Sequence, residues 1–295
     1  MVAATRATAR KRRRKPSPVG SNEPNRPETE LAPKHGVWIR NGAPHDPNET
    51  LELAVAAEAG GWDGVFVSDA IQESHTEPFT LLAAVAARTS QVMLGTWVTP
   101  LIARDVVHVA RSAANVDQLS GGRLLLGFGL GNTTEHDGLG IEREQLRSRY
   151  DAALAVLDDL LRGDTVSRHD EWFDVDDVQL NVRPAQQPRP PILLGGTWPA
   201  TSPVDRAARW DGYMPFWPGL GEGRDDSIEE GAREGELREL LAHYREQGGE
   251  GTVVLPRLSR FGSEYDGLCG QLGADWLLTC DPLDVEAIRA GPPGQ

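Results

Sequence analysis

The stretch Arg123-Leu124-Leu125-Leu126-Gly127-Phe128 is the most clearly apolar short run in the chain. Its length and its lack of alternation are typical of a strand that is buried on both faces, as in a parallel sheet. An amphipathic segment over residues 105–119 precedes it, and another over residues 147–161 follows it. A buried strand between two amphipathic helices is the repeating unit of an α/β fold.

Seven further apolar runs extend this alternation on both sides of the central strand. The predicted strands cover residues 37–39, 64–67, 92–95, 123–128, 192–194, 212–216, 252–255 and 276–278. The predicted helices cover residues 50–59 (capped by Asn48), 77–88, 105–119, 147–161, 204–210, 228–247 and 265–273. Eight strands in a row predict a single closed (β/α)8 barrel, a TIM barrel, rather than an open Rossmann sheet, and such barrels take ~250 residues.

The barrel domain is expected to span residues 34–295, after an N-terminal tail over residues 1–33. The tail is rich in Arg, Pro, Ser, Asn and Glu and lacks apolar periodicity, which predicts a disordered extension. Its basic run from Arg10 to Lys15 leaves open a second interpretation, an arm that binds nucleic acid or a partner. The formal net charge of −14 argues against nucleic-acid binding by the rest of the chain.

Composition also bears on compartment and on metals. No apolar run approaches the ~18 residues of a membrane span, and no secretory signal is evident, so we expect a cytoplasmic protein that binds no membrane. The two cysteines, Cys269 and Cys280, are too far apart in sequence for a CxxC pair and indicate reduced thiols. Without HxH or HExxH motifs, we expect no metal site.

In such a barrel the catalytic groups lie where the strands end. Glycines follow the fourth and fifth strands at this rim, at Gly129 and Gly131 and at Gly195 and Gly196. Glycine lets a ligand approach the backbone closely, and the exposed amides bind phosphate. The combination favours a flat, phosphorylated cofactor, with ordinary turn glycines as the alternative.

Several sequence blocks carry a resemblance to a known family. Residues 115–123 (NVDQLSGGR) and 124–129 (LLLGFG) resemble the signature of luciferase-like monooxygenases and their F420-dependent relatives. Further blocks at residues 94–96, 191–196 and 207–212 follow in the same order. The resemblance covers about residues 35–293 and implies a luciferase-like barrel that works as a flavin- or deazaflavin-dependent oxidoreductase.

The resemblance also implies where a cofactor lies. The flavin ring, or its deaza analogue, is expected against the third strand, at a non-prolyl cis peptide between Trp97 and Val98. Asp69, at the end of the second strand, is expected to border the ring. Many relatives have a small residue in place of Trp97, whose indole is expected either to wall the pocket or to pack under the loop. The cofactor phosphate is expected near Gly129, Gly131, Asn132, Gly195, Gly196 and Thr197.

The chain departs from the family at Ala70, where many members, especially the F420-dependent dehydrogenases, carry the histidine of an Asp-His pair. Alanine cannot transfer a proton, so His75 and His136, in nearby predicted loops, are the candidate replacements. The alternative is that both histidines, and Glu135 beside the second, only decorate the surface. Trp198 and Trp217, which both follow strand ends, are candidates to line an apolar substrate pocket, with the stabilisation of loops as the alternative.

These observations lead to one favoured function and two alternatives. The favoured function is a two-component monooxygenase that takes reduced FMN from a separate flavin reductase and uses O2 on a small organic substrate. Its catalytic candidates are Asp69, His75 and His136. The alternatives are a coenzyme F420-dependent dehydrogenase or reductase, and a flavin-binding protein without catalytic activity. The resemblance further leads us to expect a homodimer.

Overall fold

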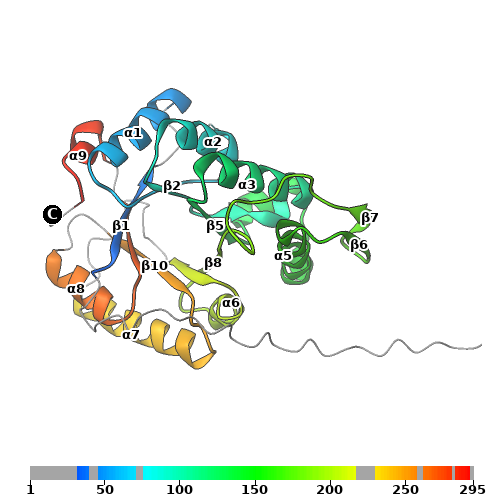
Figure 1. Cartoon of the computed structure of the whole chain (residues 1–295). Helices are drawn as coiled ribbons and strands as arrows, with labels where there is room; N and C mark the ends of the chain where they lie inside the picture. The colour runs from blue at the N-terminus through cyan, green and yellow to red at the C-terminus, as the bar shows by residue number, and fades with distance from the viewer. Residues whose placement is uncertain are drawn as a thin grey trace, which may run out of the picture. The chain divides into compact units, whose positions relative to one another are not determined.

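The computed structural model describes residues 32–39, 46–70, 76–216, 230–257, 262–280 and 283–292. Eight parallel strands form a closed ring, because β3 pairs with β5 as well as with β2 (Figure 1). The predicted (β/α)8 barrel is therefore confirmed. The barrel strands are β1 (Lys34–Ile39), β2 (Gly64–Val67), β3 (Met93–Thr96), β5 (Leu124–Gly129), β8 (Ile192–Thr197), β9 (Gly212–Phe216), β10 (Thr252–Arg257) and β11 (Trp276–Thr279).

Helices alternate with these strands along the chain and flank them in space (Figure 1). The α-helices are α1 (Pro47–Ala59), α2 (Pro78–Arg88), α3 (Val106–Ser120), α4 (Thr133–Leu139), α5 (Leu146–Arg162), α6 (Thr201–Ala207), α7 (Glu230–Glu246), α8 (Ser263–Gln271) and α9 (Val285–Arg289). Two 3-10 turns, η1 (Leu101–Ala103) and η2 (Arg143–Gln145), precede α3 and α5. The tail before residue 32 lies outside the described residues, so its predicted disorder stays a prediction.

Two predicted helix starts are wrong by about one turn. α1 begins at Pro47, and its N-cap is Asp46 rather than Asn48. The Asp46 carboxylate accepts hydrogen bonds from the amides of Asn48 (2.7 Å) and Glu49 (2.9 Å). α6 likewise starts before the predicted Val204, with Pro203 in its first turn. Proline lacks an N–H group, which costs nothing in the first turn of a helix because that donor has no partner there.

One segment lies outside the eight-strand ring. Between α5 and β8, the antiparallel strands β6 (Val166–His169) and β7 (Asp174–Val178) form a hairpin beside α5 (Figure 1). Its connecting residues carry Trp172 and Phe173. The hairpin thus holds two half-buried aromatic side chains close to the N-terminal part of α5.

The barrel interior is built around one large side chain, Phe66 of β2, which is 0% exposed. Glycines on the neighbouring strands make room for its ring. A Cβ atom at Gly95 would lie 2.4 Å from Phe66 Cδ1, and one at Gly36 would lie 2.9 Å from Phe66 Cε2. The glycines therefore belong to the core packing, since interiors are close-packed and leave no room for added atoms.

A carboxylate joins α1 to the loop before β3. Glu58 accepts hydrogen bonds from the backbone amides of Ser90 (2.9 Å), Gln91 (2.8 Å) and Val92 (3.0 Å). Partial burial acts to raise the pKa of Glu58, but these donors outweigh it and hold the pKa below its usual range. The ionised form of Glu58 therefore stabilises the fold.

We expect Glu58→Gln to lower the free energy of unfolding by about 1–2 kcal/mol at pH 7, since charge-assisted hydrogen bonds are lost. A lowered pKa in the folded state means that the stabilisation is full above the usual value of 4.5 and is lost as the pH falls below it. Urea unfolding between pH 3.5 and 7 measures this. The control is Glu52→Gln, whose exposed ion pair with Arg88 should contribute little. A Glu58→Gln deficit that stays constant over this pH range would contradict the prediction.

Candidate active site

The third barrel strand is interrupted at its C-terminal end. Its continuation, β4 (Thr99–Pro100), pairs with β5 as β3 does. Gly95 is opposite Leu125 and Thr99 is opposite Phe128, so four steps on this strand face three on β5, which is a bulge. The Trp97–Val98 peptide within this bulge is cis, as the family resemblance implied.

The side chain of Val98 extends from the bulge toward two neighbouring strands. A Cβ atom at Gly129 of β5 would lie 2.7 Å from Val98 Cγ2, and one at Gly195 of β8 would lie 3.1 Å from it. These two glycines therefore leave room for Val98 and help to hold the bulge in place. Their expected role in approaching a cofactor phosphate stays a prediction.

Trp97 lies inside the barrel. Its side chain is 4% exposed, and its ring centroid is 4.8 Å from that of Phe216, the last residue of β9, at an interplanar angle of 47°. This arrangement agrees with both expectations for Trp97, the wall of a pocket and packing under the loop, so its role stays a prediction. The pair Trp97 and Phe216 thereby forms an apolar layer next to the bulge.

Asp69 is buried just beyond β2 and is ion-paired with Arg104, which follows η1. The same guanidinium lies 3.3 Å from Glu77, the N-cap of α2. Burial raises the pKa of Asp69, while Arg104 and the nearby Thr99 hydroxyl act in the opposite direction. Burial outweighs these two partners, so the pKa of Asp69 is raised.

Three buried polar atoms at this position have no well-formed hydrogen-bond partner among the described residues. They are Asp69 Oδ2, Thr99 Oγ1 and Arg104 Nε. Unpaired polar atoms are costly in a protein interior and are rare unless a ligand or water satisfies them. These three atoms would be satisfied by a polar ligand group in the space beside the bulge.

The loop after β5 is tied together by its own side chains. Asn132 caps α4 and forms a capping box with Glu135, in which each side chain accepts from the other residue's amide at 2.9 Å. The amide of Asn132 is thus already in use, although phosphate binding was expected there. Glu135 is 4% exposed, so the interpretation of it as a solvated loop charge is wrong.

His136 is also buried in this loop, with 6% of its surface exposed. Its Nε2 atom lies 2.8 Å from the carbonyl oxygen of Leu130. A carbonyl only accepts, so Nε2 carries a proton that it donates within the loop. No hydrogen bond or ion pair joins His136 to Asp69 in the described part of the chain. The surface interpretation of His136 is therefore wrong, and its catalytic role stays a prediction.

The remaining predicted site residues, at the end of β8 and beyond it, have different neighbours from one another. The space beside Gly196 is filled by Pro203, whose Cβ would lie 2.2 Å from an added Cβ atom. Thr197 is exposed at the end of β8, and its hydroxyl makes no hydrogen bond to described residues. Trp198 is 8% exposed, with its ring centroid 6.4 Å from that of His243 on α7, so it packs against that helix. His75 and Trp217 lie outside the described residues.

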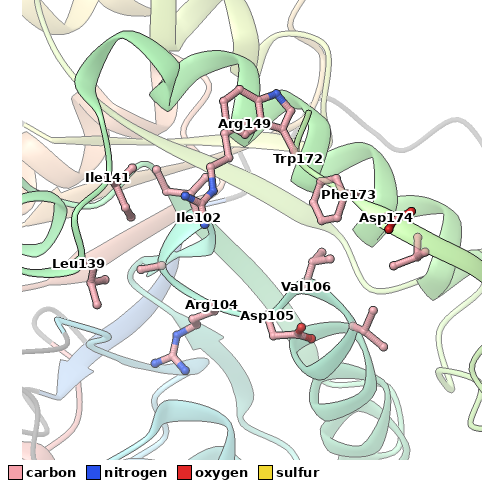
Figure 2. A pocket seen from close by; sticks show the side chains of 13 residues that line it. Ile102, Arg104, Asp105, Val106, Leu139, Ile141, Arg149, Trp172, Phe173 and Asp174 are labelled. Atoms are coloured by element: carbon pink, nitrogen blue, oxygen red, sulfur yellow. The ribbon is translucent and has the colours of Figure 1, made fainter. Parts of the chain in front are cut away.

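A pocket of about 500 Å³ opens next to Arg104 (Figure 2). It lies between η1, the start of α3, the end of α4, α5 and the β6–β7 hairpin. Sequence reasoning did not place its residues in a site, although two adjacent aromatics in a polar excursion were a usable signal. The lining comprises Ile102, Ala103, Arg104, Asp105, Val106, Val107, Leu139, Ile141, Arg149, Trp172, Phe173, Asp174 and Val175.

Two features, a cluster of metal ligands and a membrane-spanning helix, are absent from the described residues. The described residues contain no group of three or more His, Cys, Asp or Glu side chains placed to hold a metal ion. None of their helices combines the length and the apolar character needed to cross a lipid bilayer.

Comparison with known proteins places these features in a wider context. The family profile described as luciferase-like monooxygenase matches residues 30–250. The chain is 34% identical over 166 residues to the F420-dependent glucose-6-phosphate dehydrogenase of Nakamurella multipartita, which covers 53% of this chain and 48% of that protein. The chain thus spans about half the length of this curated relative.

Solved structures share the fold at low sequence identity. The monooxygenase RslO1 from Streptomyces bottropensis has a TM-score of 0.66 and 18% identity, over 87% of this chain and 97% of that one. The oxygenating constituent of 3,6-diketocamphane monooxygenase from Pseudomonas putida, a complex with FMN, has a TM-score of 0.63 and 17% identity, over 77% and 67% of the two chains.

Proposed function

This chain belongs to the luciferase-like monooxygenase family, and we propose that it acts within that family as an FMN-dependent, two-component monooxygenase. In this proposal a separate flavin reductase supplies reduced FMN, and O2 is used to oxygenate a small organic substrate. Members of the family are oxidoreductases, and the relatives of this chain include both F420-dependent dehydrogenases and monooxygenases. A homodimer remains an expectation from the resemblance, and a cytoplasmic location remains an expectation from the composition.

The observation that carries this choice is the alanine at position 70. From the resemblance we expect a histidine after this acid in many members of the family, especially the F420-dependent dehydrogenases, whereas here Ala70 follows Asp69. His136, the described candidate for its replacement, donates to Leu130 in its own loop instead. In oxygenation the bound flavin supplies the difficult chemistry, and the protein has to orient it and exclude water.

The described residues fit a flavin in part. The Val98 bulge, held between Gly129 and Gly195, would lie against the ring, and the Trp97–Phe216 layer would exclude water from the barrel side. Asp69 Oδ2 and Thr99 Oγ1, which lack a well-formed hydrogen bond to the described residues, are available to polar atoms of the ring. The free hydroxyl of Thr197 is available to a phosphate. The capping box at Asn132 occupies the amide of that residue, so fewer hydrogen-bond donors on the β5 side are available to the phosphate than the resemblance implied.

The second candidate is hydride transfer with coenzyme F420, without oxygen. It is favoured by the named sequence relatives, since several of those that are 30–34% identical to the chain are F420-dependent glucose-6-phosphate dehydrogenases. This candidate needs a proton carrier other than residue 70, and His75 and His136 stay its candidates. A flavin-binding protein without catalytic activity is the third.

The experiment is a parallel anaerobic titration of the full chain with reduced FMN and with F420. We expect FMN to bind and, with a flavin reductase and a substrate panel, substrate-dependent O2 consumption to follow. Thr197→Val should weaken FMN binding about tenfold and leave riboflavin binding unchanged, since a hydrogen bond to phosphate is worth ~1.5–3 kcal/mol. Thr201→Val, at the start of α6, is the matched control. Binding of F420 alone would overturn the proposal in favour of the second candidate, and FMN binding without turnover would favour the third.

A further inference from the structure

Arg149 of α5 lines the pocket of Figure 2 with a guanidinium that has no partner among the described residues. It is half-buried, and it makes no hydrogen bond or ion pair within the described chain. Figure 2 shows its side chain extending from α5 toward Ile102. A partly buried and unpaired guanidinium is costly, so a site of this kind favours an anion that can pair with it.

The other charged groups that line the pocket are already engaged. Arg104 is ion-paired with Asp69, and in Figure 2 its guanidinium points away from Arg149. Asp105 caps α3 with its side chain, and Asp174 lies 2.6 Å from His169 Nδ1. Among the described residues that line the pocket, Arg149 is therefore the charged side chain that is available to pair with a ligand.

The rest of the lining is mainly apolar and aromatic. Trp172 and Phe173 of the hairpin lie across from Ile102 and Ile141. Leu139 borders the same space and is 49% exposed, which is unusual for a large apolar side chain in this structure. A flat apolar ligand would cover Leu139 and stack beside the aromatic rings. The volume of about 500 Å³ falls within the ~300–1,000 Å³ typical of small-molecule sites.

We propose that this pocket binds an aromatic carboxylate, with the carboxylate on Arg149 and the ring between Trp172, Phe173 and Leu139. We further assign this class of molecule as the substrate of the oxidoreductase, an assignment that rests on the proposed function. The link is Arg104, which lines the pocket and is ion-paired with Asp69 at the rim where the cofactor is expected. The pocket and the rim thus share Arg104, which connects the proposed ligand site to Asp69.

The test is calorimetric titration of the full chain, without cofactor, with 2-naphthoate and with its neutral analogue 2-naphthamide. We expect naphthoate to bind at least tenfold more tightly, because the charge-assisted pair is worth ~1.5–3 kcal/mol. Arg149→Gln should lose this tenfold preference and keep its affinity for naphthamide. Arg147→Gln is the matched control, since Arg147 is exposed on the same helix and does not line the pocket.

Equal affinity of the wild-type chain for the two ligands would overturn the inference, and this comparison needs no variant to fold. Equal loss of naphthoate affinity in the two arginine variants would overturn it as well. If naphthoate binds through Arg149 but neither FMN nor F420 binds, the pocket stands and its assignment as a substrate site fails with the proposed function. If FMN binds and naphthoate does not, this inference alone fails.

Discussion

Replacing Asp69 with alanine is expected to lower the free energy of unfolding by about 3 kcal/mol. The Asp69 side chain is 1% exposed, and its partner Arg104 is 20% exposed. Removing one partner of a buried ion pair costs ~3–5 kcal/mol, because the other charge is left without compensation. We expect the lower end of this range, since Arg104 keeps Glu77 and reaches some solvent.

The matched control for this variant is Glu77→Gln, which removes the outer partner of the same guanidinium. Glu77 is 42% exposed in its side chain, so its loss should cost no more than about 1 kcal/mol. Chemical denaturation of both variants measures the difference, and anaerobic FMN titration should show weaker binding only for Asp69→Ala. If Asp69→Ala were as stable as Glu77→Gln, the inner pair would contribute nothing to the fold, and the prediction would be wrong.

Gly127→Ala is expected to destabilise the barrel by about 3 kcal/mol or more. A Cβ atom at this position of β5 would lie 2.1 Å from the carbonyl oxygen of Thr96 and 2.8 Å from Met214 Sδ. The first overlap is with backbone, which cannot rotate away as a flexible side chain can. Overpacking in cores costs ~1–3 kcal/mol and occasionally more. The shift would also disturb the Thr96 hydroxyl, which bonds to both the carbonyl (2.8 Å) and the amide (3.0 Å) of Gly127.

The control is Gly267→Ala in α8, where an added Cβ would meet nothing within 4 Å. That change should leave stability unchanged or raise it by up to about 1 kcal/mol, because alanine is the better helix former. Urea unfolding of both variants provides the comparison. A loss of less than about 1 kcal/mol in Gly127→Ala would show that the bulge next to it adjusts freely, and the predicted destabilisation would then be wrong.

Much of the fold was predictable, because its signals are local. Each barrel strand is a short apolar run, as at residues 124–129, and helices such as α3 and α5 show a clear amphipathic periodicity. The errors fall at helix ends such as Pro47, where the competing caps differ by only about a kcal/mol and the first turn tolerates proline. The strands of the β6–β7 hairpin are not apolar runs, because the hairpin lies outside the ring and its residues are mostly exposed or half-buried.

The site was predictable only in part. Asp69 and the Trp97–Val98 bond follow from position in the barrel and from the family resemblance. The Asp69–Arg104 pair joins residues that are 35 positions apart, and no local pattern indicates it. The packing of Trp198 against α7 and the burial of Glu135 were not predictable for the same reason, since a residue's place at a strand end does not say which way its side chain points.

By itself, the sequence determined the number and order of the eight barrel strands, since short-range hydrophobic periodicity is enough to specify them, but it did not indicate the short helices α4 and α9. Only the tertiary structure decided which side chains meet: Val98 with Gly129 and Gly195, and Arg149 with the aromatic hairpin. These meetings depend on the closure of β3 onto β5 and on where α5 then lies. Such long-range contacts are set by the packing of the whole barrel, and no window along the chain contains them.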